Sequence, residues 1–270
     1  MKHEGKINII RPFGPAIGSA TIPKILIDKI NNFVDEVVKD KKKSKQLDAG
    51  KTLAGQVTQE IFLPKEIMVG EMMGFLGNIT KAFVEGLTEK KVTKFHLISC
   101  WVVRQFQNEY NPIHMHGGHL SGAGYLKLPD DFGSSIQPEK QVNVNGKINF
   151  VYGTRQFVSN SIISQKPEVG KIFIFPNYLM HSVNPFYGKG ERRSLSFNAS
   201  IDEKVFDVKT QSNLSFWYFI NLLYSFVRSL IVFKTFGLIS FSIAAKETLN
   251  SSSSVASSSN SPSFSSFFLS

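Results

Sequence analysis

The sequence predicts an all-β core with flanking helices, an α+β fold. Several short apolar, β-favouring stretches are bounded by glycine, proline or polar residues, which is typical of strands in a buried sheet. The clearest of them are residues 92–106, 120–128, 170–176 and 191–198. Two earlier stretches instead repeat apolar residues at helical spacing. With 270 residues the chain is long enough for one sizeable domain with appendages.

Residues 1–89 are expected to form a support region of helices and strands. A helix predicted over residues 23–38 begins at a proline, whose missing N–H is harmless in the first turn. Its apolar face comprises Leu26, Ile30, Phe33, Val34, Val37 and Val38. A second helical pattern follows Pro64 and ends near Glu85, with Ile67, Met72, Phe75, Leu76, Ile79 and Phe83 as its apolar positions. Residues 47–61 are expected to be a loop that leads into a strand.

Residues 90–206 are expected to form the core. Strict alternation in the stretch 92–106 places Phe95, Leu97, Trp101 and Val103 on one face. Cys100 lies in the apolar part of this stretch and predicts a buried small hydrophobe. Because it is the single cysteine, an internal disulfide is excluded, and we expect a reducing, cytoplasmic compartment.

The region between the predicted strands 120–128 and 170–176 is expected to form a flap. Asn145-Gly146 between two alternating stretches, 142–144 and 148–150, favours a β-hairpin. We expect the surrounding residues 130–167 to face the substrate, since loops on a rigid scaffold often carry specificity.

Three of the six histidines lie within six residues, in the segment 111–119. Side chains alternate along a strand, so His114 and His116 point to the same face, and imidazole is the commonest ligand for divalent transition metals. His119 would fall out of phase, and the preceding glycine pair suggests that the chain bends away. Clustered histidines near a turn are also often only solvated. His181 follows the predicted strand 170–176, a position where a lone histidine is either a core residue or a further ligand.

The last predicted strand, 191–198, carries two arginines on opposite faces. Alternation groups Arg192 with Ser194, Ser196 and Asn198, and Arg193 with apolar residues. The planar fork of Arg192 suits a carboxylate, whereas Arg193 is expected to extend to solvent. A slip of one residue in the register would exchange the two roles.

Taken in order, the patterns HxH, GxxxxFPxxxxHxVxP and RxSxSFN resemble the Fe(II)/2-oxoglutarate-dependent oxygenase superfamily. More narrowly, the pattern NPxHxHxxxLSGxxYLxxP, present here at residues 111–129, is similar to a marine bacterial and viral group of 2OG-Fe(II) oxygenases with an HxH motif. The resemblance covers about residues 90–201 well and the N-terminal third more loosely.

The resemblance implies a double-stranded β-helix, a jelly-roll or cupin-like barrel, with the N-terminal helices buttressing it. It makes His114, His116 and His181 the iron ligands and Arg192 the partner of the distal 2-oxoglutarate carboxylate. Tyr125 and Ser194 are further candidates for cosubstrate binding. No catalytic residue is expected beyond these metal and cosubstrate ligands.

One departure concerns the residue at position 116, because the superfamily usually has Asp or Glu there. Three neutral imidazoles compensate less of the iron's charge, and an imidazole at this position argues against halogenation, for which relatives have a small residue. His119 is retained as an alternative third ligand.

The implied activity is that of an oxidoreductase. A hydroxylating dioxygenase of this kind couples oxidative decarboxylation of 2-oxoglutarate by O2 to hydroxylation of a substrate, which the sequence does not identify. Two alternatives stay open. One is a cupin-type metal dioxygenase that does not use 2-oxoglutarate, although cupins usually have a Glu shortly after HxH and none lies between His116 and Pro129. The other is a non-enzymatic barrel that serves in binding or structure.

The formal net charge is +10, but much of the excess is one lysine-rich run at 39–45 without interleaved aromatic residues. Such a run is most often a solvated helix end or loop, so we expect no nucleic-acid partner.

The C-terminal composition changes abruptly. Residues 207–250 are expected to be an apolar segment and 251–270 a disordered, serine-rich tail. The part from 214 to 245 is long enough to cross a bilayer, but Arg228 and Lys234 interrupt it. This pattern favours peripheral or anchored membrane association, in the cytoplasm or in a host cytoplasm for a viral protein. The abrupt change also fits a misframed gene end.

Overall fold

The computed structural model describes residues 7–10, 14–137, 139 and 142–206, which belong to a compact unit of Met1–Phe206. The strands are β1 (Asn8–Ile10), β2 (Ile17–Thr21), β3 (Gln59–Phe62), β4 (Phe95–Gln105), β5 (Asn111–His114), β6 (Leu120–Lys127), β7 (Ile148–Val151), β8 (Ile162–Gln165), β9 (Lys171–Pro176), β10 (Met180–Val183) and β11 (Arg192–Ile201). The helices are α1 (Lys24–Lys39), α2 (Lys41–Gln46), α3 (Lys65–Met68), α4 (Glu71–Thr88) and α5 (Glu203–Phe206).

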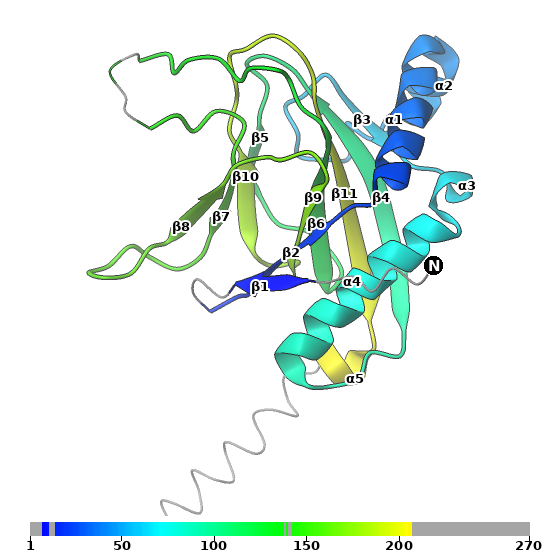
Figure 1. The fold of residues 1–270 in the computed structure, drawn as a ribbon, viewed down its shortest axis with the longest axis vertical. Coiled ribbons are helices and arrows are strands. Elements are labelled where there is room, and N and C mark those ends of the chain that lie inside the picture. The colour runs from blue at the N-terminus through cyan, green and yellow to red at the C-terminus, as the bar shows by residue number, and fades with distance from the viewer. Residues whose placement is uncertain (1–6, 11–13, 138, 140–141, 207–270) are drawn as a thin grey trace, which may run out of the picture. The chain divides into compact units, whose positions relative to one another are not determined.

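The strands form two antiparallel sheets (Figure 1). The larger sheet has the order β1-β2-β9-β6-β11-β4-β3, and the smaller sheet has the order β5-β10-β7-β8. An apolar cluster joins the two sheets, with Phe173 and Phe175 from the larger sheet and Phe150 and Val183 from the smaller one. The predicted all-β core with flanking helices is therefore confirmed.

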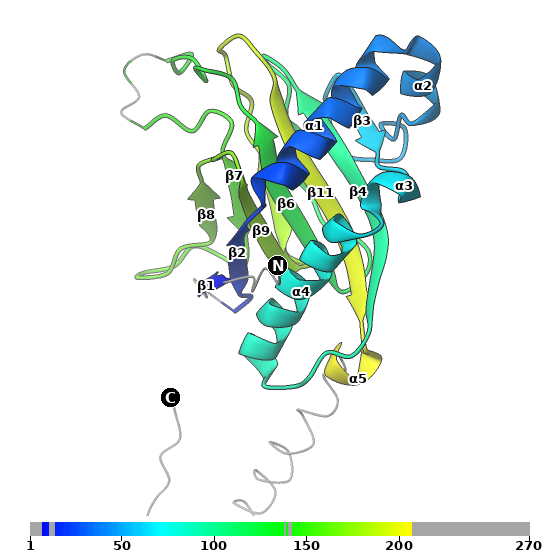
Figure 2. The same ribbon diagram turned by 45° about the vertical axis from the view of Figure 1, so that its right-hand side comes forward.

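Helices cover the other face of the larger sheet, where α1 and α4 lie across β6, β11 and β4 (Figure 2). Residues Leu26, Ile30 and Val34 of α1 are buried there, as the helical spacing predicted, whereas Val38 at the end of the face is 38% exposed. The second helical pattern is interrupted, because Gly70 has a φ of 89° that separates α3 from α4. The larger sheet thus has a helix-covered face and a face that meets the smaller sheet.

A β-bulge in β4 changes the predicted alternation. In the pairing of β4 with β11, Ser99 faces Asn198 and Leu97 faces Ala199, so Ile98 has no partner. The bulge places Phe95 and Leu97 on the helix-covered face, while Trp101 and Val103 face the smaller sheet. The prediction that these four side chains share one face was wrong, since one extra residue reverses the order of faces. Buried Cys100 agrees with its prediction.

The predicted hairpin at Asn145-Gly146 was also wrong. Only its second arm forms a strand, β7, and this strand pairs with β10 and β8. The Asn145 amide instead donates hydrogen bonds to the carbonyl oxygens of Phe132 and Gly133, and Gly146 has a φ of 65°. The Asn145 side chain therefore connects the loop before β7 to residues 132–133.

Residues 207–270, which include the predicted membrane segment and the serine-rich tail, lie outside the described residues. Among the residues that are described, no helix has the length and apolar character needed to span a membrane. The lysine-rich run forms the exposed helix α2, whose first turn is capped by Asp40.

Candidate metal centre

The smaller sheet brings the histidines of two distant segments together. His114 at the end of β5 is paired across the sheet with His181 in β10, and His116 lies two residues after the end of β5. One ring nitrogen from each of the three residues lies within 4.8 Å of the other two. A divalent ion needs such convergence, because its bonds to imidazole nitrogen are only about 2 Å long.

Backbone carbonyl groups orient two of the three imidazoles. The Nδ1 of His114 is 2.7 Å from the Pro112 carbonyl oxygen, and the Nδ1 of His181 is 3.0 Å from that of Leu179. Each ring can donate its Nδ1–H to the carbonyl, which leaves the Nε2 lone pair for a metal. The Nε2 atoms of His116 and His181 are 3.2 Å apart, so both point to one position.

The surroundings keep these rings neutral. Burial, together with the neighbouring His114, lowers the pKa of His116 to about 4 and that of His181 to about 3. Burial also lowers the pKa of His114, although its hydrogen bond to Pro112 opposes the shift. Neutral imidazole is the form that binds a metal, so the donor set fits a divalent transition metal at neutral pH.

His119 lies apart from this group. The ring Nδ1 of His119 accepts a hydrogen bond of 3.1 Å from the backbone N–H of Ile201. The backbone N–H of His119 donates to the carbonyl oxygen of Ala199. The glycines before it turn the chain toward the end of β11, and Gly118 has a φ of 89°. Of the two alternatives left by the sequence, the structure brings His116 rather than His119 to the other two histidines.

Arg192 shares a pocket with the three histidines and is only 2% exposed. Its guanidinium lies 5.0 Å from the centre of the Tyr125 ring, and its Nη1 donates a hydrogen bond of 3.3 Å to Ser194 Oγ. Its Nε has no hydrogen-bond partner, and the ion pairs found within the described residues do not include it. Burial lowers the pKa of Arg192, which the nearby Tyr125 opposes. A buried cation without a counterion favours binding of an anion.

Tyr125 is fully buried in β6, and its hydroxyl has no hydrogen-bond partner among the described residues. Burial raises the pKa of this hydroxyl, and the charge of Arg192 counteracts the rise. Ser194 and Ser196 line the pocket of the three histidines beside Arg192. The pocket lining therefore offers an anion the guanidinium of Arg192 and the hydroxyl groups of two serines, and Tyr125 lies beside the guanidinium.

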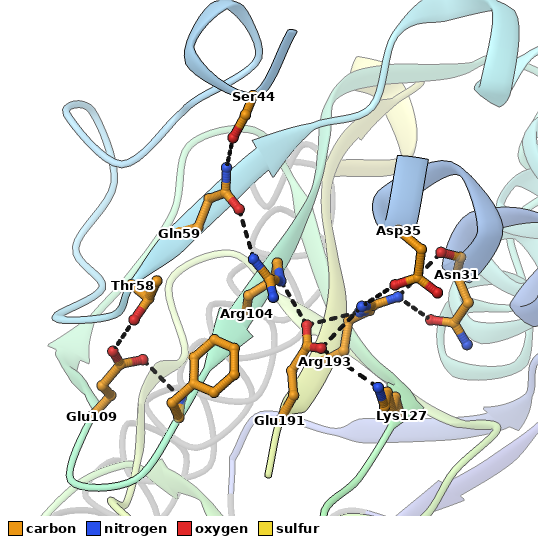
Figure 3. Close-up of polar contacts among 11 residues, drawn as sticks. Asn31, Asp35, Ser44, Thr58, Gln59, Arg104, Glu109, Lys127, Glu191 and Arg193 are labelled. Carbon is orange, nitrogen blue, oxygen red and sulfur yellow. Dashed lines mark hydrogen bonds and ion pairs between the residues drawn. The ribbon is translucent and has the colours of Figure 1, made fainter. Parts of the chain in front are cut away.

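Arg193 is also buried, so the expectation that it extends to solvent was wrong. Its side chain is 1% exposed and points to the helix-covered face (Figure 3). There it pairs with Asp35 of α1 at 2.7 Å and with Glu191 at 2.9 Å, and it donates to the carbonyl and side-chain oxygens of Asn31. Asp35 lies 158 residues from Arg193 in the chain, so alternation along the strand could not predict this pairing.

Glu191 stands at the centre of this second group of charges (Figure 3). Arg104 donates to it at 2.7 Å, and Lys127 lies 3.7 Å from its other oxygen. Burial raises the pKa of Glu191, but the hydrogen bonds from Arg193 and Arg104 outweigh that effect and hold it below its ordinary value. The carboxylate is thus ionised and fully occupied by the protein.

Two residues of the pocket that contains the three histidines were missed by the sequence analysis. Glu60 of β3, which is 2% exposed, and Asn111 of β5 both line it. Glu60 Oε2 and Asn111 Oδ1 are buried without a hydrogen-bond partner among the described residues. Glu60 lies in a segment expected to be a loop leading into a strand, and the only signal was a lone acidic residue beside apolar Ile61.

One protein family resembles the part of the chain that contains most of the residues lining the pocket. The model of a family described as "Putative 2OG-Fe(II) oxygenase" matches residues 99–198. This range contains the three histidines, Tyr125, Arg192 and Ser194. No curated protein matches the chain.

Solved structures show a partial likeness. The chain resembles a viral collagen prolyl hydroxylase from Paramecium bursaria Chlorella virus-1, with 15% identity, a TM-score of 0.43, and coverage of 68% of this chain and 94% of that one. It also resembles a prolyl-4-hydroxylase from Pseudomonas putida, with 16% identity, a TM-score of 0.42, and coverage of 67% and 91%. For HygX from Streptomyces hygroscopicus the identity is 11%, the TM-score 0.40, and the coverage 73% and 82%.

The family match agrees with the donor sets found in the pocket: three converging imidazoles and an uncompensated guanidinium. It confirms the predicted resemblance and the predicted class of enzyme, with Fe(II) as the metal and with 2-oxoglutarate and O2 as cosubstrates. Residues 99–198 are the part of the chain that is similar to the 2OG-Fe(II) oxygenase family, and the match identifies no substrate.

Proposed function

We propose that His114, His116 and His181 hold Fe(II) in this pocket and that Arg192 binds the distal carboxylate of 2-oxoglutarate. The observation that carries the proposal is the buried guanidinium of Arg192, which has no counterion among the described residues and faces the same pocket as three neutral, convergent imidazoles. A metal site alone would not need such a cation. A metal site for a dicarboxylate would, because the second carboxylate requires a partner away from the metal.

The residues around the imidazoles fix their directions and exclude water. The ring of Trp101 meets that of His116 edge to face at 5.7 Å between ring centres, and Phe175 meets His181 in the same way at 4.8 Å. Val103, Ile148 and Val183 add apolar lining. When bound, Fe(II) with 2-oxoglutarate and O2 supplies the oxidising power for hydroxylation of the substrate. The protein orients the imidazoles and lines the pocket with apolar side chains, which keep water away from the oxidising group.

The two-sheet arrangement supports a further assignment, the double-stranded β-helix. The smaller sheet carries the histidines at β5 and β10, and the larger sheet carries Arg192 on β11, so metal and carboxylate partner come from opposing walls. We expect the enzyme to work in the cytoplasm, where Fe(II), 2-oxoglutarate and the reduced state of Cys100 are maintained.

The test is anaerobic addition of Fe(II) and 2-oxoglutarate to the full chain, followed by a search for the visible charge-transfer band of the chelate. We expect a band in the wild type and in the matched control His119→Ala, and no band in His181→Ala. Circular dichroism spectra would verify that both variants are folded. Metal binding without a 2-oxoglutarate band would favour the cupin-type dioxygenase. A folded protein that binds neither would favour a non-enzymatic barrel.

A further inference from the structure

The pocket has a second polar end that the metal and cosubstrate do not use. Glu60 lies at the edge strand of the larger sheet, where its pairing partner is Val103 of β4, and Val103 in turn faces Ser194 of β11. Glu60 and Ser194 are therefore separated by two strand spacings, or about 10 Å. Both line the pocket, so its wall has Arg192 and Ser194 at one end and Glu60 at the other.

The Glu60 end presents acceptors. Glu60 Oε2 and Asn111 Oδ1 are both buried and both lack a hydrogen-bond partner among the described residues. A Cβ built on Gly55 would lie 3.0 Å from Asn111 Oδ1 and 3.0 Å from Glu60 Oε1, the other oxygen of the same carboxyl group, so the Glu60 carboxyl and the Asn111 amide oxygen lie beside the bare backbone of Gly55. The three residues come from β3, from β5 and from the loop that precedes β3.

The part of the chain that the structure describes pairs no cation with this end. Among the described ion pairs none involves Glu60, and the nearest strand neighbour with a positive charge, Arg104, is directed to Glu191 and Gln59 (Figure 3). Arg192 does not pair with Glu60 either, although both line the pocket. A buried carboxyl with unused acceptors is costly unless a partner arrives from outside.

We propose that Glu60, with Asn111, binds a positively charged, hydrogen-bond-donating group of the substrate, so that the enzyme acts on a molecule that carries a protonated amine. This inference rests on the proposed function, because it assigns the opposite end of the pocket to 2-oxoglutarate. A protonated amine has three donors and matches two converging acceptors. Such pairing would hold the neighbouring carbon atoms of the substrate over the histidines, between the two polar ends.

The ionisation behaviour of Glu60 is compatible with this role. Burial, together with the charge of Asp48, raises the pKa of Glu60 to about 7. An arriving cation would favour the ionised carboxylate and would offset the cost of its burial.

The experiment compares two probes of equal length, n-hexylammonium and 1-hexanol, on the full chain loaded with Zn(II) and 2-oxoglutarate, with binding measured by ligand-detected NMR. We expect the wild type to bind the ammonium at least about ten-fold more tightly than the alcohol, as hydrogen bonds to a charged group would provide. Glu60→Gln should remove that preference, and Asn111→Ala should reduce it by about three-fold. The exposed Glu66→Gln is the matched control and should retain the full preference.

Several results would overturn the inference. Equal binding of the two probes by the wild type would do so, as would an unchanged preference in a folded Glu60→Gln protein. Loss of metal binding in Glu60→Gln would reassign Glu60 to the metal. If Glu60→Gln does not fold, an unchanged preference in Asn111→Ala decides against the inference. The charge-transfer band of the wild type separates these cases from failure of the proposed function, in which the band itself would be missing.

Discussion

The two faces of β11 hold neighbouring arginines in opposite situations. Arg193 faces the helices and is matched by Glu191, Asp35 and Asn31, so its charge is compensated within the protein. Arg192 faces the pocket, where the described residues give it one long hydrogen bond, to Ser194, and no partner for its Nε. Both side chains are equally buried. The difference teaches that burial of a charge does not distinguish structure from function, whereas the presence or absence of a partner does.

The physical reason is the cost of removing a charge from water. A buried guanidinium is tolerated when hydrogen bonds and a counterion replace its hydration, which α1 and Glu191 provide for Arg193. At Arg192 the stacked ring of Tyr125 replaces only part of it. A bound carboxylate would complete the replacement, so the comparison yields opposite expectations for the two residues.

The largest expected effect is that of Arg192→Ala on 2-oxoglutarate binding. Removal of one partner of a buried charge pair costs about 2–5 kcal/mol, which corresponds to a loss of about 30-fold or more in affinity. The affinity can be measured by titration of the Fe(II) chelate band under anaerobic conditions. Arg193→Ala serves as the control, and weaker binding in that variant with none in Arg192→Ala would exchange the two roles.

The next effect is that of Arg193→Ala on stability. The change leaves Glu191 with fewer of its partners and Asp35 with none of those described, and breaking a buried pair on one side costs about 3 kcal/mol or more. Urea unfolding should show this decrease, whereas Arg192→Ala should be neutral or stabilising in the absence of 2-oxoglutarate. Equal destabilisation by both variants would contradict the distinction between the two faces.

A smaller effect concerns the pH dependence of stability in the metal-free protein. Unfolded His181 binds a proton below its ordinary pKa of 6.5, whereas the folded residue does so only near 3. The unfolded state therefore holds more protons in this window, and stability falls as the pH decreases. For His181 alone the loss is about 2 kcal/mol at pH 5.

The raised pKa of Glu60 acts in the opposite direction, because the folded state keeps its proton up to about pH 7. The measurement is therefore the difference between the wild type and His181→Gln in unfolding free energy at pH 7 and pH 5. A pH dependence that is identical in the two proteins would show that His181 titrates normally in the folded state.

The smallest effect is expected for Ser194→Ala. The hydroxyl accepts one hydrogen bond of 3.3 Å from Arg192, and such a bond contributes about 1 kcal/mol, so 2-oxoglutarate affinity should fall about five-fold. Ser44→Ala, which removes a hydroxyl at a distance from the pocket, should leave the affinity unchanged. A loss as large as that in Arg192→Ala would mean that Ser194, rather than the guanidinium, is the main contact of the carboxylate.

Local patterns were sufficient to predict much of the pocket. The alternation of β11 correctly separated Arg192 and Ser194 from Arg193, because the pairing of β11 with β4 keeps its register through that part of the strand. The HxH spacing predicted that His114 and His116 lie together, and the strand before His181 was placed correctly. The sidedness of β11 and the position of the strand before His181 depend on strand patterns that neighbouring residues encode, whereas His116 lies beyond the end of β5.

Other features depend on residues far apart in the chain. The sequence by itself determined that the chain forms strands and helices, that histidines cluster in one motif, and that the two arginines lie on opposite faces of one strand. Only the tertiary structure decided that Glu60 and Asn111 line the pocket of the three histidines, that Asp35 compensates Arg193, and that the bulge at Ile98 exchanges the faces of β4. Periodicity describes where a side chain points relative to its own strand, but the partner that it meets is set by how the two sheets and the helices pack.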